Sequence, residues 1–169
     1  PVSVGTSTEL GMYYIRAGRN DEAIQQLRQA LELDPKYPRA LNFLGWAYAN
    51  KHQYDEAIVQ VEKAIAVERS PLGLGNLGYV YARWGKSKEA HAVLQELSEL
   101  ARIHYVPPYL IARIHAALGE RDQALIWLNK AKAGERHLAA EPAFDSLRAD
   151  PRFIAIEARL NPDANCPQF

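Results

Sequence analysis

Few stretches of this chain combine residue types and spacing that support catalysis or cofactor binding. The segment 73–78 matches the G-x-G-x-x-G pattern of dinucleotide-binding loops. That pattern binds a pyrophosphate only after a strand and within a βαβ unit, whereas Ser-Pro at 70–71 precedes it here. The tripeptide Gly-Lys-Ser at 85–87 resembles the end of a phosphate-binding loop, but Val80 stands where its first glycine belongs. We therefore expect no cofactor.

The histidines and the single cysteine form no recognisable metal or catalytic motif. The chain contains neither His-Glu-x-x-His nor Gly-x-Ser-x-Gly. One cysteine, Cys166, supports neither a zinc site nor an internal disulfide. His115 lies at a position that carries tyrosine in the other copies of a sequence repeat, which is described below. We therefore expect it to be a hydrogen-bonded core histidine. The sequence thus predicts no catalytic residue, no metal ligand and no enzymatic activity.

The length and charge of the chain limit the classes of partner that we expect it to bind. The chain has 169 residues, enough for one domain with a real core. Lys plus Arg and Asp plus Glu both number 20, so no net charge favours direct nucleic-acid binding or a membrane surface. No apolar run approaches the roughly 18 residues of a membrane span. We expect a cytoplasmic protein, with a periplasmic domain of a membrane-anchored regulator as the alternative.

Small and apolar residues recur at a fixed period along most of the chain. Gly11 lies 34 residues before Gly45, which lies 33 before Gly78, and the next step of 34 reaches Ala112. A period of this length indicates stacked helical hairpins. Four further columns repeat in register: Ala23, Ala57, Ala90 and Ala124; Leu10, Leu44, Leu77 and Ile111; Tyr14, Tyr48, Tyr81 and His115; Leu27, Val61, Leu94 and Leu128.

The L-G-x-x-Y…A…A spacing and Pro35 resemble the tetratricopeptide repeat family. We place copies at 4–37, 38–70, 71–104 and 105–138, with copy 2 one residue short. Ala112 and His115 replace the glycine and tyrosine of copy 4. The resemblance implies an all-α fold, a right-handed superhelical solenoid of four helical hairpins within a single domain, 1–160.

The last repeat helix needs a cover, because terminal repeats otherwise expose their apolar face. Phe153, Ile156 and Leu160 follow helical spacing from Asp150 onward. We therefore predict a C-terminal cap at 139–160 over Leu125, followed by a flexible tail at 161–169.

A second resemblance concerns the C-terminal part of the chain. Residues 105–128 (YVPPYLIARIHAALGERDQALIWL) and 142–153 (PAFDSLRADPRF) look like the end of tetratricopeptide regions in bacterial multidomain signalling proteins. In such proteins the region follows a transcription-regulator, cyclase or kinase domain. The resemblance implies a bacterial regulatory module of a longer chain. Our alternative function is therefore a regulatory or oligomerisation domain that uses its N-terminal end to pack on a neighbouring domain or on a second copy, as a homo-oligomer.

The resemblance to the family implies that the first helix of each copy lines a concave groove. Counting outward from the glycine column places these residues on it: Thr8, Met12, Arg16, Asn42, Trp46, Asn50, Asn76, Tyr79, Arg83, Tyr109 and Arg113. Aromatic residues and arginine are enriched at binding hot spots. The alternative interpretation is that these residues only pack between neighbouring repeats.

From this surface we expect a non-enzymatic protein–protein interaction module. Its partner is a peptide held in the groove, acidic and with apolar anchors. Arg16, Arg83 and Arg113 supply positive potential, and Asn42 and Asn76 are available for the peptide backbone.

Overall fold

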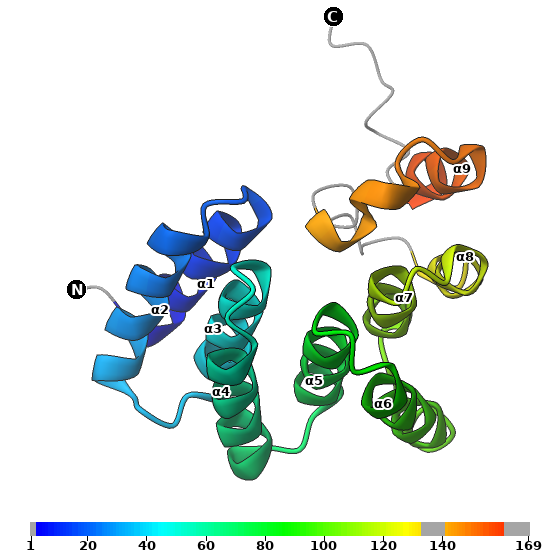
Figure 1. The fold of residues 1–169 in the computed structure, drawn as a ribbon. Helices are drawn as coiled ribbons and strands as arrows, with labels where there is room; N and C mark the ends of the chain where they lie inside the picture. Colours follow the sequence, from blue (N-terminus) through cyan, green and yellow to red (C-terminus); the bar gives the residue numbers. More distant parts are fainter. Residues whose placement is uncertain (1–2, 133–140, 161–169) are drawn as a thin grey trace, which may run out of the picture.

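The computed structural model describes residues 3–132 and 141–160, and every regular element in these ranges is helical. Figure 1 shows the helices following one another along an arc from the N-terminus to α8, with the C-terminal elements beyond. The helices are α1 Val4–Arg16, α2 Asn20–Leu33, α3 Pro38–Asn50, α4 Tyr54–Val67, α5 Pro71–Arg83, α6 Ser87–Leu100, α7 Pro108–Ala117, α8 Arg121–Leu128, the 3-10 helix η2 Pro142–Leu147, and α9 Pro151–Leu160.

The first eight helices pair into four hairpins, α1 with α2, α3 with α4, α5 with α6 and α7 with α8. Each hairpin then packs on the next one, and α1, α3, α5 and α7 adjoin in series. The predicted right-handed solenoid of four hairpins is confirmed by this arrangement. The odd-numbered helices form the inner, concave layer (Figure 1).

Local sequence explains where the helices of each hairpin begin and end. Proline occupies the first turn of α3, α5 and α7, where its missing N–H costs no hydrogen bond. A left-handed residue follows the first helix of each hairpin and turns the chain. Three of these residues are glycines with φ of 73° or 79°, and the fourth is His52 with φ of 61°.

The two helices of a hairpin touch at small residues. A Cβ built on Gly45 would lie 2.4 Å from Cγ2 of Val61 and 2.9 Å from the carbonyl oxygen of Ala57. Ala57 and Val61 have no exposed surface. At Gly11 a Cβ would meet Leu27 at 2.6 Å in the same way. The glycine and alanine columns of the sequence are therefore the contact line between helices.

The C-terminal elements cover the last hairpin. Phe144 and Phe153 are fully buried, and their ring centroids lie 6.1 Å apart. They share one core with Leu125, Leu128 and Leu147. The predicted capping helix is thus confirmed as α9, preceded by η2. The predicted boundary at 138/139 and the predicted tail at 161–169 lie outside the described residues. Among the helices of the described ranges, none has the length and hydropathy required to cross a bilayer.

The contact at Gly45 predicts a stability test with an internal control. Gly45→Ala should lower the free energy of unfolding by roughly 1–3 kcal/mol, because the methyl group meets a backbone oxygen that cannot move aside. Gly5→Ala, in α1, meets only Ser3 Oγ at 3.8 Å. It should leave stability unchanged or raise it by up to about 1 kcal/mol through helix propensity. Urea denaturation of both variants measures the difference, and equal midpoints would contradict the assigned contact.

Candidate functional site

The concave layer does not present the predicted residues as an open surface. Trp46 is 2% exposed, Arg113 is 1% exposed and Tyr79 is fully buried. The expectation of an exposed aromatic area is therefore wrong for these rings, because adjacent inner helices pack closely over them. Seven of the eleven predicted groove residues are buried: Thr8, Met12, Asn42, Trp46, Asn76, Tyr79 and Arg113. The other four, Arg16, Asn50, Arg83 and Tyr109, are partly exposed.

One polar ladder joins three consecutive inner helices. Asn76 on α5 donates through Nδ2 to the backbone oxygen of Asn42 on α3 at 3.2 Å. Arg113 on α7 donates through Nη2 to Oδ1 of Asn76. The prediction that both asparagines serve a ligand backbone is therefore corrected, since their amides are buried and bonded to neighbouring repeats.

A second ladder runs beside the first. Asn50 donates through Nδ2 to Oδ1 of Asn20 at 3.3 Å and accepts from the hydroxyl of Tyr79 at 3.1 Å. Arg83 donates through Nη1 to the same hydroxyl at 3.0 Å. Burial raises the pKa of Tyr79 above its ordinary value, so this hydroxyl keeps its proton. Arg83 is thus committed to a structural contact at its Nη1.

Arg113 is the central charge of the concave layer. Its guanidinium carbon lies 5.2 Å from the ring centroid of Trp46 and 4.9 Å from that of Tyr79. Aromatic faces stabilise a desolvated cation, but a buried charge also needs an opposite charge.

The opposite charge comes from Glu141, which sequence reasoning missed. Glu141 precedes η2 and is 1% exposed, and its Oε1 lies 3.9 Å from Nη1 of Arg113. Burial raises the pKa of its carboxyl group, while Arg113 and Arg16 oppose that rise. In the sequence, Glu141-Pro142 indicates only the start of a helix. The one sequence signal for a buried acid was Arg113, an arginine on the inner face of a repeat helix that would need an opposite charge.

A cavity of about 340 Å³ remains where these side chains meet. Five of the predicted groove residues line it, namely Met12, Arg16, Trp46, Tyr109 and Arg113. Four unpredicted residues complete the wall, Arg39, Phe43, Leu72 and Glu141. The structure therefore brings part of the predicted groove together and leaves out Thr8, Asn42, Asn50, Asn76, Tyr79 and Arg83.

Several polar atoms of the residues lining the cavity have no hydrogen-bond partner. The donors are Nε1 of Trp46, Nε of Arg113 and Nε of Arg16, and the acceptor is Oε1 of Glu141. Buried polar groups are nearly always paired in native proteins. The four unpaired atoms, all buried and all in residues that line one cavity, mark a place where polar capacity remains unused.

Comparison with known proteins matches part of the chain to a family. Residues 8–73 match the tetratricopeptide repeat family. These residues are tetratricopeptide repeats. The crystal structure of a thermophilic TPR protein from Thermus thermophilus matches with a TM-score of 0.65 at 20% identity, over 98% of this chain and 93% of that one. That match shows the fold.

The curated relatives are mostly much longer proteins. ALBINO3-like protein 3, mitochondrial, from Arabidopsis thaliana is 28% identical over 82% of this chain and 27% of its own length. Superkiller complex protein 3 from Homo sapiens is 32% identical over 57% of this chain and 6% of its own. Regulatory protein RapG from Bacillus subtilis is 26% identical over 79% of this chain and 39% of its own. The chain therefore spans less than half of the length of these relatives.

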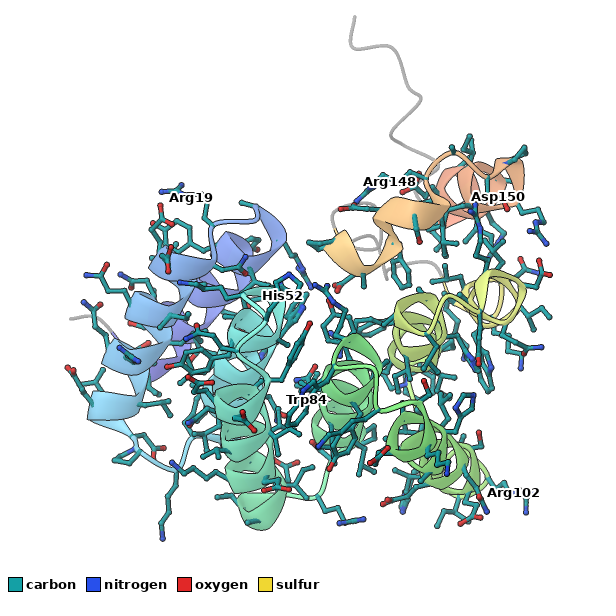
Figure 2. The ribbon with its side chains drawn as sticks, viewed as in Figure 1. Arg19, His52, Trp84, Arg102, Arg148 and Asp150 are labelled. Atoms are coloured by element: carbon teal, nitrogen blue, oxygen red, sulfur yellow. The ribbon has the colours of Figure 1, made fainter. Side chains whose placement is uncertain are left out.

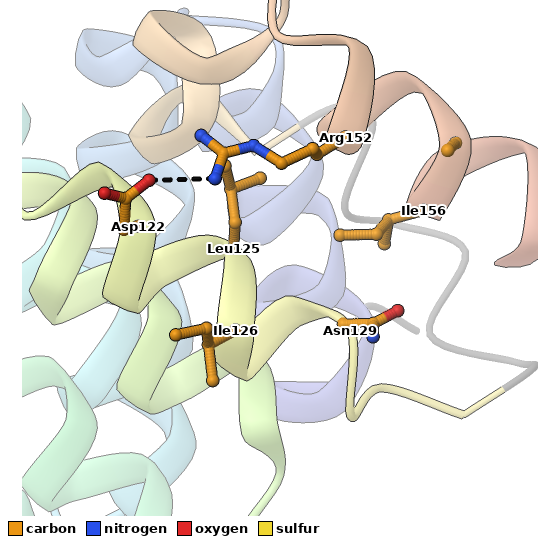
Figure 3. Close-up of a pocket in the computed structure, with 7 residues that line it drawn as sticks. Asp122, Leu125, Ile126, Asn129, Arg152 and Ile156 are labelled. Carbon is orange, nitrogen blue, oxygen red and sulfur yellow. Dashed lines mark hydrogen bonds and ion pairs between the residues drawn. The ribbon is translucent and has the colours of Figure 1, made fainter.

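A second cavity lies at the C-terminal end of the solenoid, between α8 and α9 (Figure 3). Its volume is about 380 Å³, and its walls are mainly apolar, with Leu125, Ile126 and Ile156. Arg152 and Asp122 form an ion pair of 2.8 Å at its edge. Within the described residues, none of the buried unpaired polar atoms belongs to a residue lining it. This cavity lacks the polar signal of the concave one.

His115 has the hydrogen bond expected of a histidine in the tyrosine column. Its Nδ1 lies 2.6 Å from Oε2 of Glu120, and Nε2 of His91 lies 2.9 Å from Oε1 of the same carboxylate. The hydrogen bond to the backbone oxygen of Ser87, followed by the one to Glu120, raises the pKa of His91. The described ranges contain no cluster of three residues able to hold a metal ion.

The burial of Trp46 predicts a large stability effect. Trp46→Ala should lower the free energy of unfolding by about 3–5 kcal/mol, as removal of a buried aromatic side chain does. Trp84, labelled in Figure 2, is the control, because it is partly exposed and stacks on Tyr54 at 5.8 Å. Trp84→Ala should cost roughly 1 kcal/mol, close to the worth of one aromatic pair. Chemical denaturation measures the free energy of unfolding of both variants. A loss in Trp46→Ala no larger than the loss in Trp84→Ala would refute the role of Trp46 as a buried packing residue.

Proposed function

We propose that this chain binds a segment of a protein partner in its concave face, at the cavity between α1, α3, α7 and Glu141. Tetratricopeptide repeats act in general as protein-interaction scaffolds, and the chain carries them. The observation that supports this particular site is the set of unpaired donors around the cavity, Trp46 Nε1 and Arg113 Nε above all. A ligand that accepts these hydrogen bonds would remove the cost of leaving them unmade.

The charges around the cavity favour an acidic segment. Arg16, Arg39 and Arg113 contribute three guanidinium groups against one carboxylate, that of Glu141. Arg39 is already paired with Glu9 at 2.8 Å, but Arg16 and Arg113 retain unpaired Nε donors. Guanidinium groups recognise carboxylates through charge-assisted hydrogen bonds.

The remaining wall favours an apolar anchor beside the acidic group. Phe43, Trp46 and Leu72 supply aromatic and aliphatic surface, and Met12 adds a thioether that adapts its shape. About 340 Å³ is enough space for one aliphatic or aromatic side chain. We therefore propose a partner segment that combines a carboxylate with a neighbouring apolar side chain, bound at micromolar strength or weaker.

Arginine substitution tests this function. A random peptide library displayed on phage is selected against the full chain, and binders are measured on Arg16→Gln and on the control Arg102→Gln. Arg102 follows α6, away from the cavity (Figure 2), and carries the same charge change. Arg16→Gln should weaken acidic binders at least tenfold, which is about 1.4 kcal/mol, while Arg102→Gln leaves them unchanged. Binders that ignore Arg16→Gln would place binding elsewhere and refute the proposal.

A second candidate function is docking through the N-terminal end, as in a regulatory or oligomerisation domain. Tyr13 is 62% exposed, whereas its counterparts in the next three copies, Ala47, Val80 and Ile114, are fully buried. Leu10, one turn away, is 39% exposed. An apolar edge of this kind is typical of an interaction surface. One relative, RapG, is a regulatory protein, which is compatible with this alternative.

Light scattering of the purified chain separates this candidate from groove binding. Self-association through the N-terminal end should fall at least fivefold in Tyr13→Ser. It should persist in Tyr105→Ser, which changes a tyrosine that is 61% exposed at the start of the last repeat. A chain that stays monomeric at high concentration would eliminate the oligomerisation candidate and leave groove binding unaffected.

A further inference from the structure

The segment 141–147, which we name the strap, lies across the concave side of the solenoid. Ala143 packs against a core formed by residues of α1 to α5. Phe144 and Leu147 belong instead to the core of α7, α8 and α9. Figure 1 shows η2 facing the tops of α1 and α3 on one side and α7 on the other. The strap therefore connects two parts of the molecule that the solenoid itself holds apart.

The two ends of the strap are held very differently. Phe144 and Leu147 are fully buried in a well-packed aromatic and aliphatic core. Glu141 is also buried, but its Oε1 has no hydrogen bond and stands 3.9 Å from the nearest Arg113 nitrogen. A buried ion pair offsets its desolvation cost only with close contact and additional hydrogen bonds. The cap end is thus an anchor, and the Glu141 end is a weakly compensated contact.

The strap also fills the site incompletely. It supplies one carboxylate, which is 3.9 Å from Arg113 and is also influenced by the charge of Arg16. It leaves the apolar space beside Trp46 unfilled and Trp46 Nε1 unpaired. Its backbone at Glu141 is extended, with φ of −83° and ψ of 111°, as in a bound peptide segment. A segment that offered the same carboxylate and also an apolar side chain would satisfy groups that the strap leaves unsatisfied.

We propose that Glu141 is a built-in occupant of the groove and that the partner's acidic residue replaces it at Arg113 and Arg16, so that strap and partner exclude each other. This inference rests on the proposed function of the same cavity. Residues 141–143 leave the groove while Phe144 and Leu147 stay anchored in the cap. The partner is accordingly an extended segment with a glutamate or aspartate and a neighbouring apolar residue.

Competition within one chain has a quantitative consequence. A tethered segment acts at an effective concentration in the millimolar range when the linker is short. A free peptide with the same intrinsic affinity for the cavity therefore binds poorly until the affinity of the tethered segment is lowered. Weakening Glu141 should raise the affinity for an added acidic peptide, which is the opposite of what a direct binding residue would do.

The test uses the full chain and a peptide copied from its own strap. The probe is the acetylated and amidated hexapeptide Ala-Ala-Glu-Pro-Ala-Phe, the sequence of residues 139–144. A matched peptide carries glutamine in place of glutamate. Trp84→Phe and Trp127→Phe leave Trp46 as the sole tryptophan, so its fluorescence reports occupation of the cavity. Binding is measured for this background, for Glu141→Gln, and for the control Asp145→Asn, an exposed acid on the same η2 helix.

The Glu141→Gln variant should bind the glutamate peptide at least tenfold more tightly than the background protein does. The same variant should bind the glutamine peptide at least tenfold more weakly than it binds the glutamate peptide. Asp145→Asn should match the background within twofold. Ala143→Arg, which keeps Glu141 but adds bulk where Ala143 packs, should reproduce the gain. Thermal melts verify that each variant remains folded.

Equal affinity of the background, Glu141→Gln and Ala143→Arg for the glutamate peptide would overturn the exclusion. Loss of peptide binding in Glu141→Gln would also overturn it, because it would make Glu141 part of the binding surface. Library binders that depend on Arg16 but are insensitive to Glu141→Gln would leave the proposed function standing and remove only the strap. Binders insensitive to both substitutions would remove both.

Discussion

The structure depends on close approach between helices at positions where a side chain larger than hydrogen or methyl does not fit. Gly45 touches Val61 and the backbone of Ala57, and Gly78 meets Ile114 of the next hairpin at a built Cβ distance of 2.5 Å. The contact within a hairpin recurs at Gly11 and Gly45, and the contact at Gly78 sets how closely the fourth hairpin packs on the third. The same closeness brings α3, α5 and α7 near enough for Asn42, Asn76 and Arg113 to bond in a ladder.

That closeness also decides what the concave layer can offer a partner. Inner residues that a helical projection places on a surface are covered by the adjacent helix, so the hydroxyl of Tyr79 bonds to Asn50 and Arg83. Within the described residues, one cavity of the concave side lies between the first hairpins and α7, and Glu141 forms part of its wall. The remaining polar capacity, on Trp46, Arg16 and Arg113, is therefore concentrated at one point instead of spread along a groove.

Periodicity made the fold predictable, while the site depended on contacts that periodicity does not encode. The glycine and alanine columns place helices correctly because packing at 3.6 residues per turn and a 34-residue repeat leave few alternatives. Burial of Trp46 was not predictable by counting along one helix, since it depends on how far the next repeat rotates over it. Glu141 was missed for another reason, because it lies in a segment outside the repeat, 28 residues along the chain from Arg113.

A cap that also crosses the concave side explains why the last described segment carries both aromatic residues and a buried acid. Covering Leu125 and Leu128 requires only apolar side chains, and Phe144, Leu147 and Phe153 meet that need. Glu141 contributes nothing to that cover, and burying its carboxylate is costly unless Arg113 is nearby. Arg113, in turn, would be a buried cation without a counter-charge if the strap began at Pro142 and lacked Glu141. Each charge is therefore tolerated only because the other is present, and any segment that brings its own carboxylate to Arg113 meets the same requirement that Glu141 meets now.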